Sequence, residues 1–171
     1  MERDHQRTRP RRQGRWNIAV IIPSQPAGSD RHEVERATGK VHVTRICVSH
    51  DCGLVINPDG LRNQIEGGVI QTVSRTLMEQ VNWTRARVTS VDWATYPIMR
   101  FHDVPKVEVV LIDRPTEQPW GAGEPTPTAI PAAVANAIEN ATGVRIASLP
   151  FTPERVYRAL HGVLPAVRPV P

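Results

Sequence analysis

One carboxylate stands in a stretch rich in glycine and proline, where backbone and side chain could together serve a ligand. Glu124 follows Gly121-Ala122-Gly123 and precedes Pro125 in the segment QPWGAGEPTPTAIPAAVANAIENATG. Glycines have no Cβ, so the backbone there can pass close to a bound group. The small apolar residues that follow predict a helix, whose N-terminus suits an anion or an oxygen ligand. The alternative is a first-turn helix carboxylate with a purely structural role.

A glutamine beside a glycine pair forms a second candidate. Gln64 precedes Gly67-Gly68 within LRNQIEGGVIQTVSRTLMEQV, and its amide could reach a ligand lying over those glycines. Each glycine inside a helix costs roughly 1 kcal/mol relative to alanine, so the pair needs a reason. Close approach of a large group and tight helix packing are both open, as is an exposed helical Gln64.

Three potential metal ligands are close in sequence, but we assign no metal to them. Cys47, His50 and Cys52 lack the second ligand pair that a structural zinc site requires, and an iron–sulfur cluster needs four thiolates. Small buried thiols at the end of a strand explain the two cysteines. The sequence contains neither a Walker loop nor a G-x-S-x-G elbow.

Hydrophobic periodicity predicts an α+β fold, with a small mixed sheet and two main packed helices. Apolar residues recur every fourth position from Leu61 to Leu77, which is typical of one face of an amphipathic helix. Asn57 or Asp59 could cap that helix, and Gly143 could end the second one. The expected sheet strands lie near 41–48, 86–92 and 106–113, and the main helices near 60–80 and 128–141, with Pro131 in the first turn. Further strands are expected at 16–22 and within 145–151, and a final short helix after Thr152.

Composition divides the 171 residues into a basic, loop-rich segment (1–40), a central domain (41–160) and a loose tail (161–171). Six arginines fall within the first 15 residues, which could dock on nucleic acid. A solvated N-terminus explains them better, because no aromatic residue is interleaved with them. No run is long enough to span a bilayer. Two cysteines cannot make a disulfide framework, so we expect a reducing, cytoplasmic compartment.

Three motifs in fixed order resemble a known family. ICVSHDCGLVINPDGLRNQIEGGVIQ is followed by YPIMR…VPKVEVVLID and then by GAGEPTPTAIPAAVANAI…ATGVRIASLPF. Together they are similar to the C-terminal part of the molybdopterin-binding large subunit of the xanthine dehydrogenase/aldehyde oxidase family, of the isoquinoline 1-oxidoreductase β-subunit type. The resemblance covers roughly residues 39–151.

The resemblance implies specific roles for the candidate residues. Glu124 matches the general base of the G-x-G-E motif, in enzymes that insert a water-derived oxygen into an aldehyde or an N-heterocycle. Gln64 matches a residue that contacts the pterin, and Gly67, Gly68 and Gly123 match the small positions around it. The cofactor implied is molybdenum-molybdopterin, which supplies the redox chemistry while the protein supplies position and a base.

The family's large subunit is several times longer than this chain, and its cofactor lies between well-separated segments. We therefore expect a hydroxylase segment that needs upstream parts of the large subunit, together with an iron–sulfur subunit and a small-molecule substrate. A non-catalytic remnant or interaction module without cofactor is the alternative. A periplasmic location is the alternative to the cytoplasm, because some relatives are exported. The residues lining the substrate pocket lie mostly upstream, so the sequence does not identify the substrate.

Overall fold

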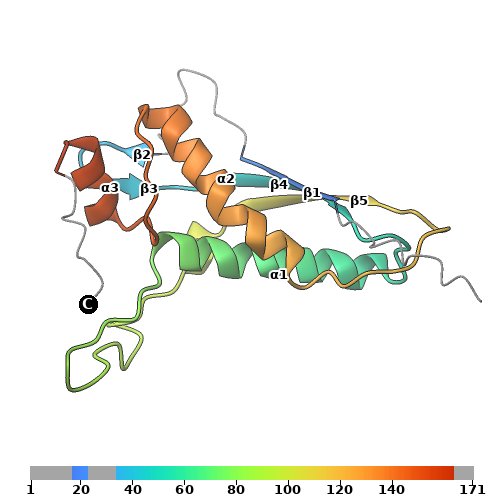
Figure 1. Ribbon diagram of the computed structural model, residues 1–171, viewed down its shortest axis with the longest axis horizontal. Helices are drawn as coiled ribbons and strands as arrows, with labels where there is room; N and C mark the ends of the chain where they lie inside the picture. Colours follow the sequence, from blue (N-terminus) through green and yellow to red (C-terminus); the bar gives the residue numbers. More distant parts are fainter. Residues whose placement is uncertain (1–16, 23–33, 164–171) are drawn as a thin grey trace, which may run out of the picture.

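The structure is a computed structural model that describes residues 17–22 and 34–163. It forms two layers, a small sheet and a pair of crossed helices that cover one face of that sheet (Figure 1). Residues 1–16 and 23–33 of the basic N-terminal segment, and residues 164–171 of the tail, lie outside the described residues. No helix in the described part of the chain combines the length and apolar character that a membrane crossing requires.

The main sheet is mixed, as predicted. Its strands are β1 (Asn17–Ile21), β4 (Arg45–Asp51) and β5 (Lys106–Ile112), in the order β1-β4-β5. β1 is antiparallel to β4, whereas β5 is parallel to it, so the chain between β4 and β5 must cross over. A separate two-stranded sheet joins β2 (Val34–Glu35) to β3 (Lys40–Val41). The α+β class is confirmed.

The first helix, α1 (Pro58–Leu77), runs along the long axis of the molecule beside the sheet (Figure 1). It carries the predicted apolar stripe. Ile65, Val69 and Val73 are fully buried in the core, and Leu61 is only partly buried because it lies near the helix start. Asn57 is the N-cap, and its side-chain oxygen accepts a hydrogen bond from the Gly60 backbone N–H at 2.9 Å.

The second helix, α2 (Pro125–Thr142), packs across α1, and α3 (Pro153–Leu160) closes the described fold. α2 begins three residues before the predicted start, so Pro131 lies inside the helix and removes one backbone hydrogen bond there. Gly143 ends α2 with a φ of 77°, as predicted, because a left-handed residue there costs glycine little. Thr152 caps α3 through the Arg155 backbone N–H.

Two strand predictions were wrong and a third was too long. Residues 86–92 form no strand. They take part only in an isolated bridge between Trp83 and Val88, in a loop whose backbone hydrogen bonds join residues of the same loop. Alternation alone could not reveal that no neighbouring strand pairs with them. Residues 145–151 form no strand either; the Phe151 backbone N–H instead donates to the Thr76 carbonyl at 2.7 Å. The strand predicted at 41–48 is interrupted at 42–44.

Alternation along β4 buries a histidine in the core. Ile46, Val48 and His50 face the helices, and His50 is 1% exposed. Neither ring nitrogen of His50 has a hydrogen-bond partner among the described residues. Burial lowers the pKa of His50, and the nearby Asp51 carboxylate opposes that effect only in part. The neutral imidazole is therefore the folded form.

This burial predicts acid-sensitive stability. The unfolded chain binds a proton to His50 near the ordinary value of about 6.5, whereas the folded chain resists it. The free energy of unfolding should be intact above that pH and fall as the pH drops toward the lowered folded pKa, by at most about 1.4 kcal/mol per pH unit. Urea unfolding of His50→Gln from pH 7.5 to 5 should lack this component. The exposed His161→Gln is the control, and an unchanged slope in His50→Gln would contradict the assignment.

Candidate functional site

The loop between β5 and α2 carries Glu124, and a clamp at the end of β4 holds that loop in place. Asp51 is buried and accepts a hydrogen bond from Arg114 Nε at 2.9 Å. The same carboxylate oxygen accepts the Gly53 backbone N–H at 3.1 Å. Backbone bonds from Arg114 to Gly53 and from Trp120 to Cys52, at 3.0 and 2.8 Å, continue the contact. The approach to Glu124 is thereby tied to the sheet.

Gly53 is required within this clamp for two reasons. Its φ is 81°, a left-handed value that disfavours residues with a Cβ. A Cβ built there would lie only 2.3 Å from the Gln118 carbonyl oxygen, which is part of the same loop. Backbone therefore packs directly on backbone where the loop crosses the turn after β4.

The Glu124 carboxylate is exposed at the start of α2 and is not used to stabilise the helix. Glu124 occupies the N-cap position with αR backbone angles, and its side chain makes no capping hydrogen bond. Within the described residues no hydrogen bond or ion pair of this carboxylate is found. The purely structural alternative considered above, a first-turn helix carboxylate, therefore has no side-chain hydrogen bond behind it in this geometry.

Packing of α1 on α2 brings the predicted residues together from two distant parts of the chain. A Cβ built at Gly123 would lie 3.5 Å from Gln64 Nε2, so the Gln64 amide lies against the glycine next to Glu124. One turn further along α1, a Cβ at Gly68 would lie 3.4 Å from Pro127 Cδ. Gly68 therefore lies where α1 packs on α2, but a Cβ there would make only an ordinary van der Waals contact with Pro127, so this packing does not by itself require glycine.

Gly67 and Gly121 differ from Gly68, because a Cβ at either would meet nothing within 4 Å. Both therefore leave open space, Gly67 on the helix that carries Gln64 and Gly121 in the loop that carries Glu124.

The N-terminus of α2 offers fewer backbone N–H donors than a helix start normally does, since Pro125 and Pro127 have none. Side chains and the glycine loop are thus the main polar groups of this surface.

The cluster of Cys47, His50 and Cys52 is divided by the sheet. Cys47 lies on the face opposite His50, with its Sγ 3.6 Å from Glu108 Oε2. Arg45 and Lys106 contact Glu108 at 2.5 and 2.9 Å and hold the pKa of that carboxyl at about 2. Burial raises the pKa of the Cys52 thiol, so it is a packing residue here.

Sequence reasoning missed the clamp. Asp51 and Arg114 are 63 residues apart, and no local pattern connects them. The available signal was an acidic residue at the end of one strand and an arginine two residues beyond the end of another.

Residues 30–105 match the sequence profile of a family described as a molybdopterin cofactor-binding domain. A subunit of nicotinate dehydrogenase from Pseudomonas putida is 47% identical over 129 residues, which are 75% of this chain and 11% of that protein. The β subunit of isoquinoline 1-oxidoreductase from Brevundimonas diminuta is 34% identical over 69% of this chain and 15% of its own length.

The fold agrees with a solved relative. Quinoline 2-oxidoreductase from Pseudomonas putida 86 superposes with a TM-score of 0.68 at 30% identity, covering 75% of this chain and 17% of that one. The chain thus spans 11 to 17% of the lengths of these three proteins. The similarity reaches well beyond any single motif, because it covers three quarters of this chain in both sequence and structure.

Two glycines with left-handed φ provide a matched test of the clamp. Gly53→Ala should destabilise the chain through both backbone strain and collision with Gln118. Gly143→Ala has a similar φ, 77°, but open space around its Cβ, so it carries only the strain of about 1 kcal/mol. Urea denaturation should show a clearly larger loss for Gly53→Ala. Equal losses would mean that the loop moves aside freely and that the clamp does not hold it.

Proposed function

Because the chain belongs to the family of molybdopterin-binding subunits of xanthine dehydrogenase/aldehyde oxidase type, we propose that it is the base-bearing segment of a molybdenum hydroxylase. Its reaction would insert a water-derived oxygen into an aldehyde or an N-heterocycle. The observation that carries the proposal is the packing of α1 on α2, which sets the Gln64 amide against Gly123, next to the unpaired Glu124 carboxylate. Other segments of the large subunit and an iron–sulfur subunit would complete the enzyme.

The described residues fit a pterin cofactor in shape and in chemistry. Gly67 and Gly121 leave open space where any side chain would intrude, so a flat group can approach the backbone. The Gln64 amide can both donate and accept hydrogen bonds, which matches the polar edge of a pterin. When bound, the molybdenum cofactor supplies the two-electron redox chemistry of the reaction. We propose Gln64, Gly67, Gly68 and Gly123 as this chain's contribution to holding it.

Glu124 would serve as the general base, because its carboxylate is unpaired and free to accept a proton. Its position depends on α2, which begins directly after it, and on the clamped loop directly before it. Both neighbours restrict the position of the carboxylate, and neither forms a hydrogen bond with it. In this chain Glu124 is open to solvent, so the remaining segments of the large subunit would have to exclude water from it.

A non-catalytic interaction module is the second candidate. The exposure of the Gln64–Glu124 surface favours it, since nothing in the described residues encloses a cofactor there. The two candidates predict different results once the remaining segments are supplied.

Replacement of the base separates catalysis from assembly. Co-expression of the chain with an iron–sulfur subunit and with the part of the Pseudomonas putida nicotinate dehydrogenase protein outside the matched 129 residues would provide the assembled complex. Glu124→Gln should retain molybdenum, measured by metal analysis, and lose hydroxylation of nicotinate or benzaldehyde by at least about 100-fold. The exposed Glu154→Gln in α3, away from this loop, is the control. Full turnover by Glu124→Gln would refute the base, and a wild-type complex without molybdenum would favour the non-catalytic module.

Gly67 predicts opposite effects on stability and on cofactor binding. In the chain alone, Gly67→Ala should raise the free energy of unfolding by up to about 1 kcal/mol, because alanine is the better helix former and meets no neighbour. In the assembled complex the added methyl should lower the molybdenum content. Gln71→Ala, one turn further along α1 and exposed, should leave that content unchanged. Normal metal loading of Gly67→Ala would remove Gly67 from the cofactor site.

A further inference from the structure

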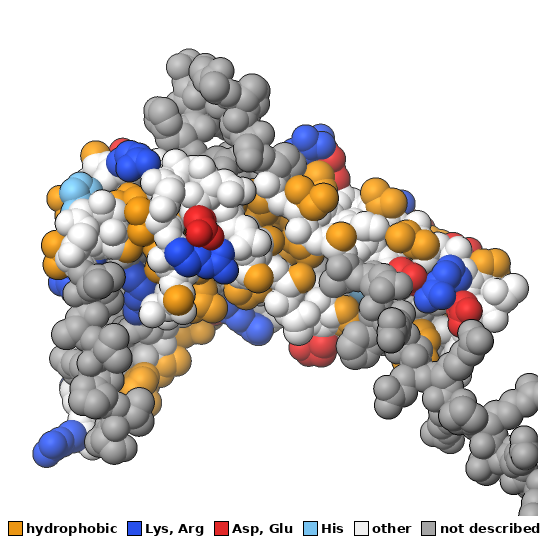
Figure 2. Space-filling model, turned by 45° about the horizontal axis from the view of Figure 1, so that its top comes forward, with side chains coloured by type: hydrophobic (Ala, Val, Ile, Leu, Met, Phe, Trp, Pro, Cys, Tyr) orange, Lys and Arg blue, Asp and Glu red, His pale blue; other side chains and the backbone are white. Residues whose placement is uncertain are grey.

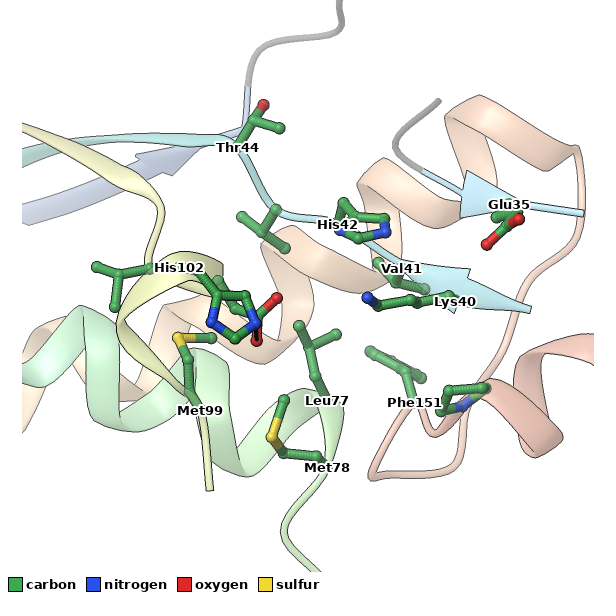
Figure 3. A pocket seen from close by; sticks show the side chains of 14 residues that line it. Glu35, Lys40, Val41, His42, Thr44, Leu77, Met78, Met99, His102 and Phe151 are labelled. Carbon is green, nitrogen blue, oxygen red and sulfur yellow. Dashed lines mark ion pairs between the residues drawn. The ribbon is translucent and has the colours of Figure 1, made fainter. Parts of the chain in front are cut away.

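Two surface features lie at the end of α1 that is remote from Gln64. One is a cavity of ≈ 720 Å³ between β3 and the 3-10 helix η1 (Phe101–Asp103), whose rim mixes the Lys40 ammonium with carboxylates and so favours no particular charge (Figure 3). The other is an arm formed by residues 79–100, with hydrophobic side chains along it at the lower left of Figure 2. Neither feature includes residues of the loop before α2, so Glu124 has to be positioned by contacts of its own loop.

The half-buried Trp120 side chain lies against the turn that follows β4. A Cβ built at Gly53 would lie 3.4 Å from Trp120 Cδ1, so the indole packs directly on the glycine backbone. The Trp120 backbone N–H donates to the Cys52 carbonyl oxygen at 2.8 Å, next to that contact. Ring and backbone of one residue therefore contact the same turn, and the Asp51–Arg114 ion pair secures that turn.

Only two residues separate Trp120 from the next fixed point of the loop. Gly121 and Ala122 connect it to Gly123, where a Cβ would lie 3.5 Å from Gln64 Nε2. Glycine has more backbone freedom than any other residue, and a Cβ at Gly121 would meet nothing within 4 Å. Neither the backbone of Gly121 nor its surroundings restrain this part of the loop, so the restraint has to come from the contacts on either side of it.

Trp120 can position Glu124 without touching it. Four residues reach at most about 14 Å when fully extended, so fixing Trp120 limits where the Glu124 carboxylate can lie. A displacement of about 1 Å in a reacting group can cost on the order of 100-fold in rate. A large ring with only two side-chain torsions suits such an anchor, because it makes a wide contact at a small cost in conformational entropy.

We propose that Trp120 is a positioning residue for the reaction: its indole, packed on the Gly53 backbone, anchors the glycine loop and thereby sets the position of the Glu124 carboxylate. This inference rests on the proposed function, because Trp120 has this task only if Glu124 takes up a proton. It assigns Trp120 no part in holding the cofactor or the substrate. Removal of the ring should therefore slow the reaction through Glu124 and leave molybdenum and substrate binding intact.

Amide exchange in the chain alone tests the anchor without any activity. In Trp120→Ala the backbone amide at position 120 should exchange at least about tenfold faster by NMR, after correction for intrinsic rates, because the ring no longer holds the loop on the turn. Trp120→Phe keeps a flat ring and should stay within about threefold of the wild-type rate. Trp93→Ala, which removes an exposed indole from the arm, is the control.

Circular dichroism verifies that each variant is folded. If Trp120→Ala does not fold, Trp120→Leu takes its place, because it keeps apolar bulk but not the flat ring. Unchanged amide exchange in the folded variant overturns the anchor.

Kinetics of the assembled complex, prepared as for Glu124→Gln, test the consequence for the reaction. Trp120→Ala should lower kcat for nicotinate by about 10- to 100-fold, with KM and molybdenum content unchanged. Trp120→Phe should recover most of kcat, and Trp93→Ala should not alter it. In the Glu124→Gln background, Trp120→Ala should change the residual rate by less than about twofold, because Trp120 acts only through Glu124.

The outcomes distinguish the anchor from the proposed function. Wild-type kcat in Trp120→Ala, together with an inactive Glu124→Gln, overturns the anchor and retains the base. Loss of molybdenum, or an equal loss of rate in the Glu124→Gln background, also overturns it, because Trp120 would then serve the cofactor or the substrate. Full turnover by Glu124→Gln, or a wild-type complex without molybdenum, refutes the proposed function and with it the task of Trp120, whatever amide exchange shows.

Discussion

Ile65, Val69 and Val73 of α1 are buried between the sheet and α2, and the positions of the other elements depend on this packing. One helix face thereby contacts both the sheet and the neighbouring helix. Because the stripe repeats every four residues, it fixes the rotation of α1 about its axis. The neighbouring rows of side chains then have defined directions. Gly68 faces α2 at Pro127, Gln64 faces the loop at Gly123, and Gly67 faces open space.

The loop that carries Glu124 is restrained at both ends, by β5 before it and by α2 after it, and the Asp51–Arg114 clamp holds its middle. A loop of this kind positions a carboxylate without using that carboxylate as a structural group. This matters for a base, because hydrogen bonds to a carboxylate favour its charged form and weaken its ability to take a proton. Asp51, and not Glu124, accepts the hydrogen bonds that hold the loop in place.

α1 also relates the two ends of the molecule. Gln64 and Leu77 are separated by 13 positions, or about 20 Å along the helix axis. The candidate cofactor surface lies near Gln64, and Leu77 lines a cavity of ≈ 720 Å³ at the other end of the helix. A single helix with a continuous buried stripe therefore runs from the candidate cofactor surface to that cavity.

The sequence determined α1 and α2, the strands β1, β4 and β5, the Gly143 cap and the identity of the candidate residues, and it narrowed the N-cap of α1 to Asn57 or Asp59. These features depend on local periodicity, on turn chemistry and on motifs whose residues are adjacent in the chain. It could not determine whether residues 86–92 had a partner strand, because pairing depends on a second segment. Tertiary structure alone decided that Asp51 meets Arg114, that Gly68 packs on Pro127 while Gly67 stays open, and that a cavity forms at the end of α1. Each of these outcomes depends on contacts between residues far apart in sequence, and no local pattern of side chains specifies such contacts.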